Sequence, residues 1–188
     1  MRIREVSPDT VAGSWSDDLV LSKLWLIRKL NGINHRFGTV YILGSWYGNL
    51  SLLMLDKHLE FDKLINVDIN AKALDSGDKM ADKLGLSGKI TSMRKDANEL
   101  DYRQISDGGL VINTSCNNIS GMDWFNSIPD GTVVALQGRD NDPGAVNVFD
   151  DSHSLASMYE CSRVLYDGHI ALEDPETGYT RYMLIGIK

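Results

Sequence analysis

Cysteine and proline are scarce in this sequence, which has two cysteines and four prolines in 188 residues. Cys116 and Cys161 are too few for a disulfide framework, and the four histidines lie far apart without the spacing of metal ligands, so we predict no metal site. No apolar run approaches the roughly 18 to 20 residues that span a bilayer, and the first ten residues lack the apolar core of a signal peptide. These absences favour a cytoplasmic protein without a membrane partner.

Positive charge is also in short supply. The chain has 19 Lys and Arg against 26 Asp and Glu, which gives a net charge of -7 at pH 7, and the basic residues are scattered. Proteins that follow a nucleic acid backbone usually gather basic residues into a patch or stripe. Nucleic acid is therefore disfavoured as a partner, and a small molecule is favoured.

Helical and strand patterns alternate along the chain. Helices are predicted at residues 16–33, 48–58, 70–85 and 152–166. Strands are predicted at residues 39–43, 63–69, 90–97, 109–115 and 131–138, with two more in 169–188 joined by the turn DPETG. This alternation is typical of a mostly parallel sheet with helices on both faces, and the short last turn makes the final two strands antiparallel. We expect a single α/β domain over residues 1–188, with a Rossmann-like seven-stranded sheet that ends in an antiparallel hairpin.

A glycine loop follows the strand at 39–43, in the sequence LGSWYG. Gly44 and Gly48 allow a ligand to approach the backbone closely at the start of the next helix, although both also suit a tight turn with no ligand. Asp68 ends the second strand about twenty residues further on, where a carboxylate can accept from both hydroxyls of a ribose. Asp96 ends the third strand at the equivalent level. The pattern predicts a nucleotide-like ligand at this edge.

From Thr39 to the C-terminus, the sequence resembles the class I S-adenosylmethionine-dependent methyltransferases. The resemblance implies S-adenosylmethionine as the cofactor. It implies that the cofactor-binding residues are Gly44, Ser45, Trp46, Gly48, Asp68, Ile69, Asp96, Ala97 and Asn113. The first motif is divergent, because the family usually has an acidic residue where this chain has Ile42 and a middle glycine where it has Trp46. Trp46 either makes a cation–π contact with the methyl sulfonium or packs against the N-terminal helix.

Asn113 ends the fourth predicted strand, and Thr114, Ser115 and Cys116 follow it. Family members that methylate amines of bases have two prolines and an aromatic residue after an Asn or Asp here, and this chain lacks them. The resemblance therefore favours a small polar acceptor, with Asn113 as a catalytic residue and Ser115 and Cys116 in the acceptor pocket. The alternative is that these polar residues cap the turn that follows the strand.

A long polar loop, residues 136–155, follows the fifth predicted strand at the same edge. We expect Gln137 and Arg139 to bind the acceptor, since a guanidinium can clamp a carboxylate or a phosphate, and His153 to take a proton as a catalytic base. The alternative makes Arg139 a solvated charge and places His153 in the first turn of a helix. Residues 1–38 are expected to form an extension and helix that cover the cofactor or acceptor side, with Trp15 in a lid.

Three functions remain open from the sequence. The first is methyl transfer from S-adenosylmethionine to a small polar acceptor. The second is a non-catalytic member of the fold that binds S-adenosylmethionine, for which Ile42 and Trp46 are the arguments. The third is a nicotinamide-dependent oxidoreductase, since Asp68 would also bind the ribose of that cofactor; the bulky residues of the glycine loop and the final hairpin argue against it.

Overall fold

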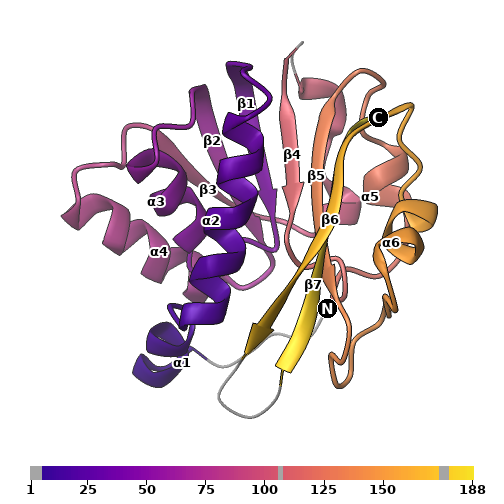
Figure 1. The fold of residues 1–188 in the computed structure, drawn as a ribbon. Helices are drawn as coiled ribbons and strands as arrows, with labels where there is room; N and C mark the ends of the chain where they lie inside the picture. The colour runs from indigo at the N-terminus through magenta and orange to yellow at the C-terminus, as the bar shows by residue number, and fades with distance from the viewer. Residues whose placement is uncertain (1–5, 106–107, 174–177) are drawn as a thin grey trace.

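A seven-stranded sheet forms the centre of the computed structural model, which describes residues 6–105, 108–173 and 178–188 (Figure 1). The strands are β1 (Phe37–Leu43), β2 (Phe61–Asp68), β3 (Ile90–Arg94), β4 (Leu110–Asn113), β5 (Val133–Arg139), β6 (Arg163–Glu173) and β7 (Gly178–Ile187). The helices are α1 (Pro8–Gly13), α2 (Asp17–Asn31), α3 (Asn49–Asp56), α4 (Ala71–Lys83), α5 (Asp123–Asn126) and α6 (Ser152–Met158), with the 3₁₀ turns η1 (Ala97–Glu99) and η2 (Tyr102–Gln104).

The strands lie in the order β3-β2-β1-β4-β5-β7-β6. The first five strands are parallel, and β7 inserts antiparallel between β5 and β6. The chain leaves β1 toward β2 on one side and later returns to place β4 on the other side. The switch point of the sheet is therefore the carboxyl end of β1, which is where open α/β sheets bind ligands.

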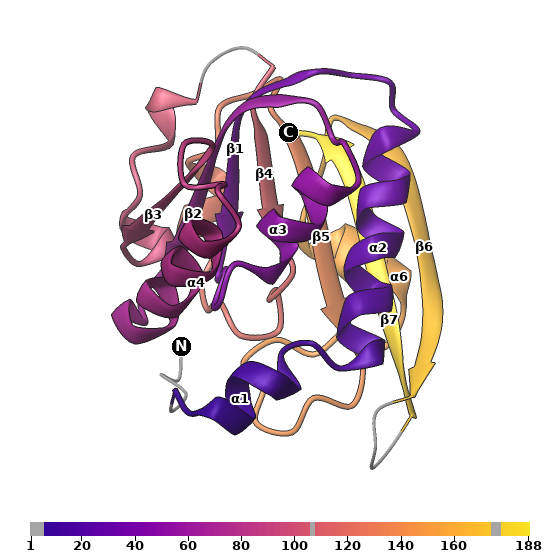
Figure 2. The same cartoon turned by 90° about the vertical axis from the view of Figure 1, so that its left-hand side faces the viewer.

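Helices cover both faces of the sheet (Figures 1 and 2). Alternate residues of β1 enter different cores, because side chains of a strand point to opposite faces. Val40 and Ile42 pack in the core with α2 and α3, whereas Tyr41 and Leu43 pack in the core with α5 and α6. The apolar strands are thus buried on both faces, and the predicted fold class is confirmed.

The predicted helix at residues 152–166 is wrong in its second half. Helix α6 ends at Met158, and β6 starts at Arg163. The Tyr159 ring leaves the helix and packs at 5.2 Å from the Phe125 ring, fully buried. From Arg163 onward the backbone pairs with β7, with a register shift between Val164 and Tyr166, so pairing with a distant strand outweighs the local helical pattern. The predicted turn DPETG falls largely on residues 174–177, outside the described residues.

The N-terminal segment is folded against the glycine loop. A capping box between Ser7 and Thr10 starts α1, which the sequence did not predict. The Thr10 hydroxyl lies 2.8 Å from the Tyr47 hydroxyl, and the Asn49 side-chain amide donates to the Ser14 carbonyl at 2.9 Å. Helix α1 therefore lies at the carboxyl edge of the sheet (Figure 2). None of the helices in the described ranges combines the length and the hydrophobicity of a membrane span.

Candidate cofactor and acceptor site

The glycine loop turns sharply through three residues with left-handed backbone. Gly44 has φ +62°, Trp46 has φ +53° and Gly48 has φ +69°. A Cβ on Gly48 would lie 2.8 Å from Nδ2 of Asn66, and a Cβ on Gly44 would lie 3.3 Å from the side chain of Ser115. Glycine is therefore needed at position 48, both for the left-handed backbone and because a side chain would clash with Asn66. Gly44 keeps open the space between β1 and the end of β4.

Asp68 joins the glycine loop to the end of β2. One carboxylate oxygen accepts from the Trp46 backbone N–H at 2.8 Å, and the other accepts from the Asn70 N–H at 2.8 Å. The side chain is 3% exposed, and its burial raises the pKa of the carboxyl although the backbone N–H groups oppose that shift. A carboxylate has about four lone-pair positions, so these two hydrogen bonds leave acceptor capacity for further hydroxyls.

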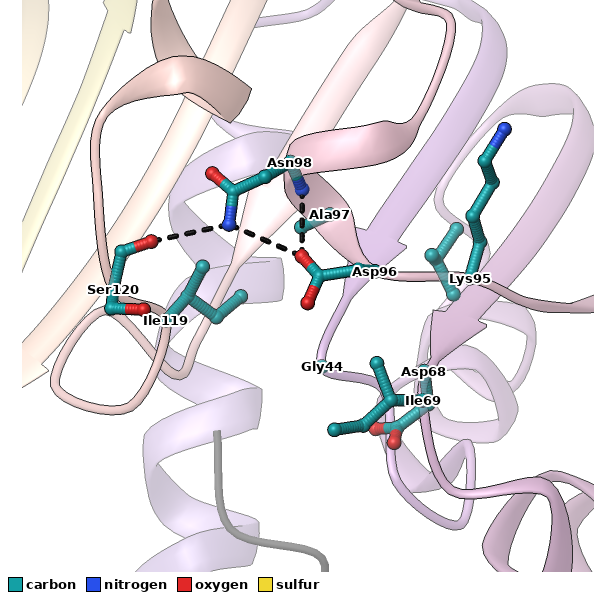
Figure 3. Close-up of a pocket in the computed structure, with 10 residues that line it drawn as sticks. Gly44, Asp68, Ile69, Lys95, Asp96, Ala97, Asn98, Ile119 and Ser120 are labelled. Carbon is teal, nitrogen blue, oxygen red and sulfur yellow. Dashed lines mark hydrogen bonds between the residues drawn. The ribbon is translucent and has the colours of Figure 1, made fainter.

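The ends of β2 and β3 enclose a small cavity of about 20 Å³ (Figure 3). Asp96 accepts from the backbone N–H of Asn98 at 2.9 Å and from its side-chain amide at 3.1 Å. That amide also donates to the Ser120 carbonyl at 3.2 Å, while the Lys95 side chain points away from the Asp96 carboxylate. An adenine ring is larger than this cavity. A base that enters here must therefore displace the bridge from Asn98 to Ser120.

A larger cavity of about 590 Å³ lies on the other side of Gly44. Its size is that of a site for a small ligand. Helix α2, the glycine loop, the ends of β2 and β4, the loop after β5, and β7 contribute residues to it. Its lining is Ser14, Leu19, Lys23, Ile42, Gly44, Ser45, Trp46, Tyr47, Asn49, Leu50, Asp68, Ile69, Asn70, Thr114, Ser115, Asn118, Arg139, Asp142, Pro143, Gly144 and Arg181.

Comparisons with known proteins agree on the architecture. No protein-family model and no curated protein sequence matches this chain. Its structure is similar to the N-methyltransferase NodS of Bradyrhizobium japonicum WM9 in complex with S-adenosyl-L-homocysteine, at 9% identity and a TM-score of 0.70 over 96% of this chain and 93% of that one. The chain has the class I methyltransferase fold.

Two further methyltransferase structures share the architecture. The rRNA methylase of Streptococcus thermophilus matches at 14% identity and a TM-score of 0.58, over 93% of this chain and 99% of that one. The geranyl diphosphate methyltransferase in complex with SAM matches at 12% identity and a TM-score of 0.63, over 87% and 84%. Identities this low relate the chain to these enzymes by fold.

Most of the predicted cofactor residues line the two cavities of this methyltransferase fold. The larger cavity contains Gly44, Ser45, Trp46, Asp68 and Ile69. Asp96 and Ala97 line the smaller one, which also touches Gly44, Asp68 and Ile69. Two of the predicted acceptor residues, Ser115 and Arg139, line the larger cavity as well. The structure thus gathers nine residues that the sequence assigned to one site, and their roles remain predictions.

Three predicted site residues are instead buried inside the protein, and none of them lines either cavity. The Asn113 side-chain oxygen accepts from the Ser115 N–H at 2.8 Å, so this residue caps the turn after β4. The Gln137 amide donates to the Ser22 carbonyl at 3.3 Å and accepts from the Ser22 hydroxyl at 3.2 Å. Cys116 is fully buried, and burial raises the pKa of its thiol to about 12. Each of these side chains turns inward, so the structure does not bring Asn113, predicted as a catalytic and cofactor-binding residue, or Cys116 and Gln137, predicted in the acceptor pocket, to either cavity.

Three other predicted residues also stay out of both cavities. His153 is exposed in the first turn of α6, with a ring nitrogen 3.4 Å from the Ser157 hydroxyl. Trp15 packs against the core between α2 and the sheet. Gly48 is the last residue of the glycine loop, and a Cβ on it would point at Asn66. The structure therefore does not place His153 as a base or Trp15 as a lid over the site.

Sequence reasoning missed two cationic residues of the larger cavity. Lys23 lies on α2, on a helix face that is otherwise largely apolar. Arg181 is the single charged residue of β7 and is 8% exposed. A lone charge in an apolar strand is a signal that sequence inspection can use, since such a charge is rarely buried without a partner. No cluster of three or more potential metal ligands occurs within the described ranges.

Proposed function

We propose that this chain is an S-adenosylmethionine-dependent methyltransferase that acts on a small polar acceptor. The single observation that carries the proposal is the cavity of about 590 Å³ at the switch point, which the glycine loop and Asp68 line together. The fold similarity to NodS in complex with S-adenosyl-L-homocysteine supports the choice of cofactor.

The residues present fit this cofactor. Gly44 lines both cavities, and a side chain there would crowd the Ser115 side chain, because its Cβ would lie 3.3 Å from it. Asp68 would hold the ribose hydroxyls with the acceptor capacity that the loop leaves free. Asp96, two residues beyond the end of β3, would accept from the exocyclic amine of the base once the Asn98 bridge opens. The carboxylates at successive strand ends therefore match a nucleoside.

The acceptor half of the cavity positions the second substrate. When bound, S-adenosylmethionine supplies an electrophilic methyl group that an acceptor lone pair attacks in line. Ser115 and Asn118 follow β4 and line this half with polar side chains. They orient an acceptor beside Gly44, and correct orientation alone lowers the barrier by several kcal/mol. The N-terminal segment contributes Ser14 and Leu19 to the wall and so helps exclude water.

A second candidate is a non-catalytic protein that binds the same cofactor. Ile42 lines the larger cavity at the position where an acidic residue is usual in the family. An apolar side chain there provides no acceptor for the amino-acid end of the cofactor. This observation favours binding without efficient transfer.

Calorimetry with S-adenosylhomocysteine tests the proposal, and calorimetry with NAD tests the alternative of a nicotinamide-dependent oxidoreductase. Gly44→Ala and Gly85→Ala form a matched pair, because both glycines have left-handed backbone while a Cβ on Gly85 meets nothing within 4 Å. Both variants lose about 1 to 2 kcal/mol of stability. We expect tight binding of S-adenosylhomocysteine by wild type and Gly85→Ala, and at least tenfold weaker binding by Gly44→Ala.

The calorimetry separates the candidates. Binding of NAD alone would support an oxidoreductase, and no binding of either ligand would exclude both cofactor functions. A screen of small polar acceptors for release of S-adenosylhomocysteine then separates a methyltransferase from a non-catalytic binder.

A further inference from the structure

Three cationic side chains line the acceptor half of the larger cavity. Lys23 comes from α2, Arg139 from the end of β5, and Arg181 from β7. Arg139 and Arg181 are paired residues of neighbouring antiparallel strands. The fold therefore gathers three positive charges at one wall, in a chain whose net charge is -7.

The three positive charges repel one another. Burial lowers the pKa of Lys23 to about 8, and the Arg181 guanidinium adds to that shift. Burial likewise lowers the pKa of Arg181, with a further contribution from Arg139. Like charges that face one another in a partly enclosed space are unfavourable unless an anion lies between them.

The carboxylates nearby neutralise this wall only in part. Asp142 also lines the cavity, but its carboxylate lies 4.0 Å from the Arg139 guanidinium. Asp18 attracts Lys23, yet it is buried and accepts from the Tyr179 hydroxyl at 2.8 Å. Neither carboxylate makes a short ion pair with one of the three cations. The wall therefore keeps a positive field toward the cavity.

Each of the two guanidinium groups also has an N–H donor without a hydrogen-bond acceptor among the described residues. Arg181 donates from Nη2 to the Thr114 carbonyl at 2.7 Å, and Arg139 donates from Nη2 to the Asn141 carbonyl at 3.1 Å. The Nε of each is buried and has no hydrogen-bond acceptor among the described residues. The Arg139 guanidinium is held over the Tyr179 ring at 4.4 Å, which fixes its plane. Oriented guanidinium groups with spare donors bind carboxylates and phosphates bidentately.

We propose that Lys23, Arg139 and Arg181 form a subsite for an anionic group, a carboxylate or a phosphate, of the methyl acceptor. This inference rests on the proposed function, because it names the class of acceptor for the same cavity. The wall belongs to the β4, β5 and β7 side of Gly44, whereas Asp68 and Asp96 lie on the β2 and β3 side. The cofactor and the anion therefore occupy opposite halves of the site.

Titration with inorganic phosphate at constant ionic strength tests the subsite, in protein saturated with S-adenosylhomocysteine. Lys23→Met, Arg139→Gln and Arg181→Met each remove one positive charge. Arg28→Gln is the matched control, since Arg28 is exposed on the same helix as Lys23. We expect each of the three variants to bind phosphate at least tenfold more weakly and the control to bind as wild type. Equal phosphate affinity in all proteins, or no phosphate binding by wild type, would overturn the subsite. If Arg181→Met fails to fold, Lys23→Met and Arg139→Gln decide.

A second arm separates the acceptor from the cofactor's own carboxylate. S-adenosylhomocysteine carries an amino-acid carboxylate, and 5′-methylthioadenosine lacks it. We expect the three variants to bind both compounds as wild type does. Loss of S-adenosylhomocysteine affinity alone would assign the cations to the cofactor and overturn the acceptor subsite. Failure of wild type to bind either adenosine compound would instead contradict the proposed function, while phosphate binding without them would still report on the cations.

Discussion

Asp68 is the residue at which a substitution tests the proposed function most directly. Its two carboxylate oxygens accept from the N–H groups of Trp46 and Asn70, each at 2.8 Å. In Asp68→Asn the amide oxygen can accept from one of these N–H groups, and the amide NH₂ faces the other. One buried donor then lacks an acceptor, which costs about 1 to 3 kcal/mol of the free energy of unfolding. Since domains have about 5 to 15 kcal/mol of stability, we expect the variant to fold.

The effect of pH on that stability has a definite sign. The pKa of Asp68 is raised in the folded protein because the carboxyl is buried. An acid with a raised folded pKa gives a contribution to stability that is present below its unfolded pKa of 3.8 and is lost as the pH rises through the folded pKa. The difference in stability between wild type and Asp68→Asn is therefore expected to widen as the pH falls through that range.

Cofactor affinity should fall at least as much as stability. Hydrogen bonds to a charged group contribute about 1.5 to 3 kcal/mol each, and two ribose hydroxyls would lose their shared anionic acceptor in Asp68→Asn. We expect binding of S-adenosylhomocysteine to weaken by about 2 to 4 kcal/mol, which corresponds to roughly 30- to 1000-fold. Calorimetry at neutral pH measures this change directly.

A ligand without the ribose hydroxyls separates a direct contact from damage to the loop. Wild type should bind S-adenosylhomocysteine more tightly than its 2′,3′-dideoxy analogue, and in Asp68→Asn this preference should nearly vanish. If both ligands weaken by the same factor, Asp68 acts through the loop that it holds and does not bind the ribose. Unchanged affinity in the folded variant would refute the assignment altogether.

Three further changes test the geometry around the site. Gly48→Ala should destabilise the fold by about 1 to 2 kcal/mol or more in denaturant titrations, because φ is +69° and the new Cβ would lie 2.8 Å from Asn66; an unchanged midpoint would contradict this turn geometry. Below pH 8, Lys23→Met should be more stable than wild type, because the charged ammonium of Lys23 is buried and its folded pKa of about 8 lies below the unfolded value of 10.5. This difference in stability should disappear as the pH rises from 8 to 10. A difference that stays constant over that range would show that Lys23 is not desolvated. Tyr179→Phe should cost about 1 to 3 kcal/mol, because it removes a donor to buried Asp18 at 2.8 Å, and a neutral result would mean that solvent reaches this carboxylate.

The sequence predicted the strands well wherever apolar residues continue to a polar strand end. Thr39–Leu43 and Lys63–Ile69 fall within or beside β1 and β2, because buried parallel strands are apolar on both faces. The chain from Arg163 to Tyr166, the start of β6, gave no such signal. Its strand conformation comes from pairing with β7, whose partner residues are about twenty positions away, and local periodicity does not contain that information.

The sequence predicted a site at the edge of the sheet where both cavities lie, but several of the predicted side chains do not line these cavities. Position at a strand end fixes the level of a residue in the sheet, so Asp68 and Asp96 were found. It does not fix whether a side chain turns toward the ligand or back into the protein, and Asn113 and Gln137 turn back to satisfy backbone groups and Ser22. Arg181 was missed because only the three-dimensional structure shows that β7 lies beside β5 in the sheet.

Trp46 illustrates how tertiary contacts can replace the conformational freedom of glycine. An L-residue in left-handed backbone costs roughly 1 to 2 kcal/mol, and Trp46 has φ +53°. Its N–H donates to Asp68, and its ring lies 4.5 Å from the ring of Tyr47, whose hydroxyl contacts Thr10 of α1. An aromatic pair of this kind contributes about 0.5 to 1.5 kcal/mol, and a hydrogen bond to a carboxylate contributes about 1.5 to 3 kcal/mol. These gains offset the backbone cost, so the loop keeps the left-handed turn that a middle glycine would give. The divergent motif therefore changes what covers the loop, an indole and the N-terminal helix, while its left-handed turn is retained.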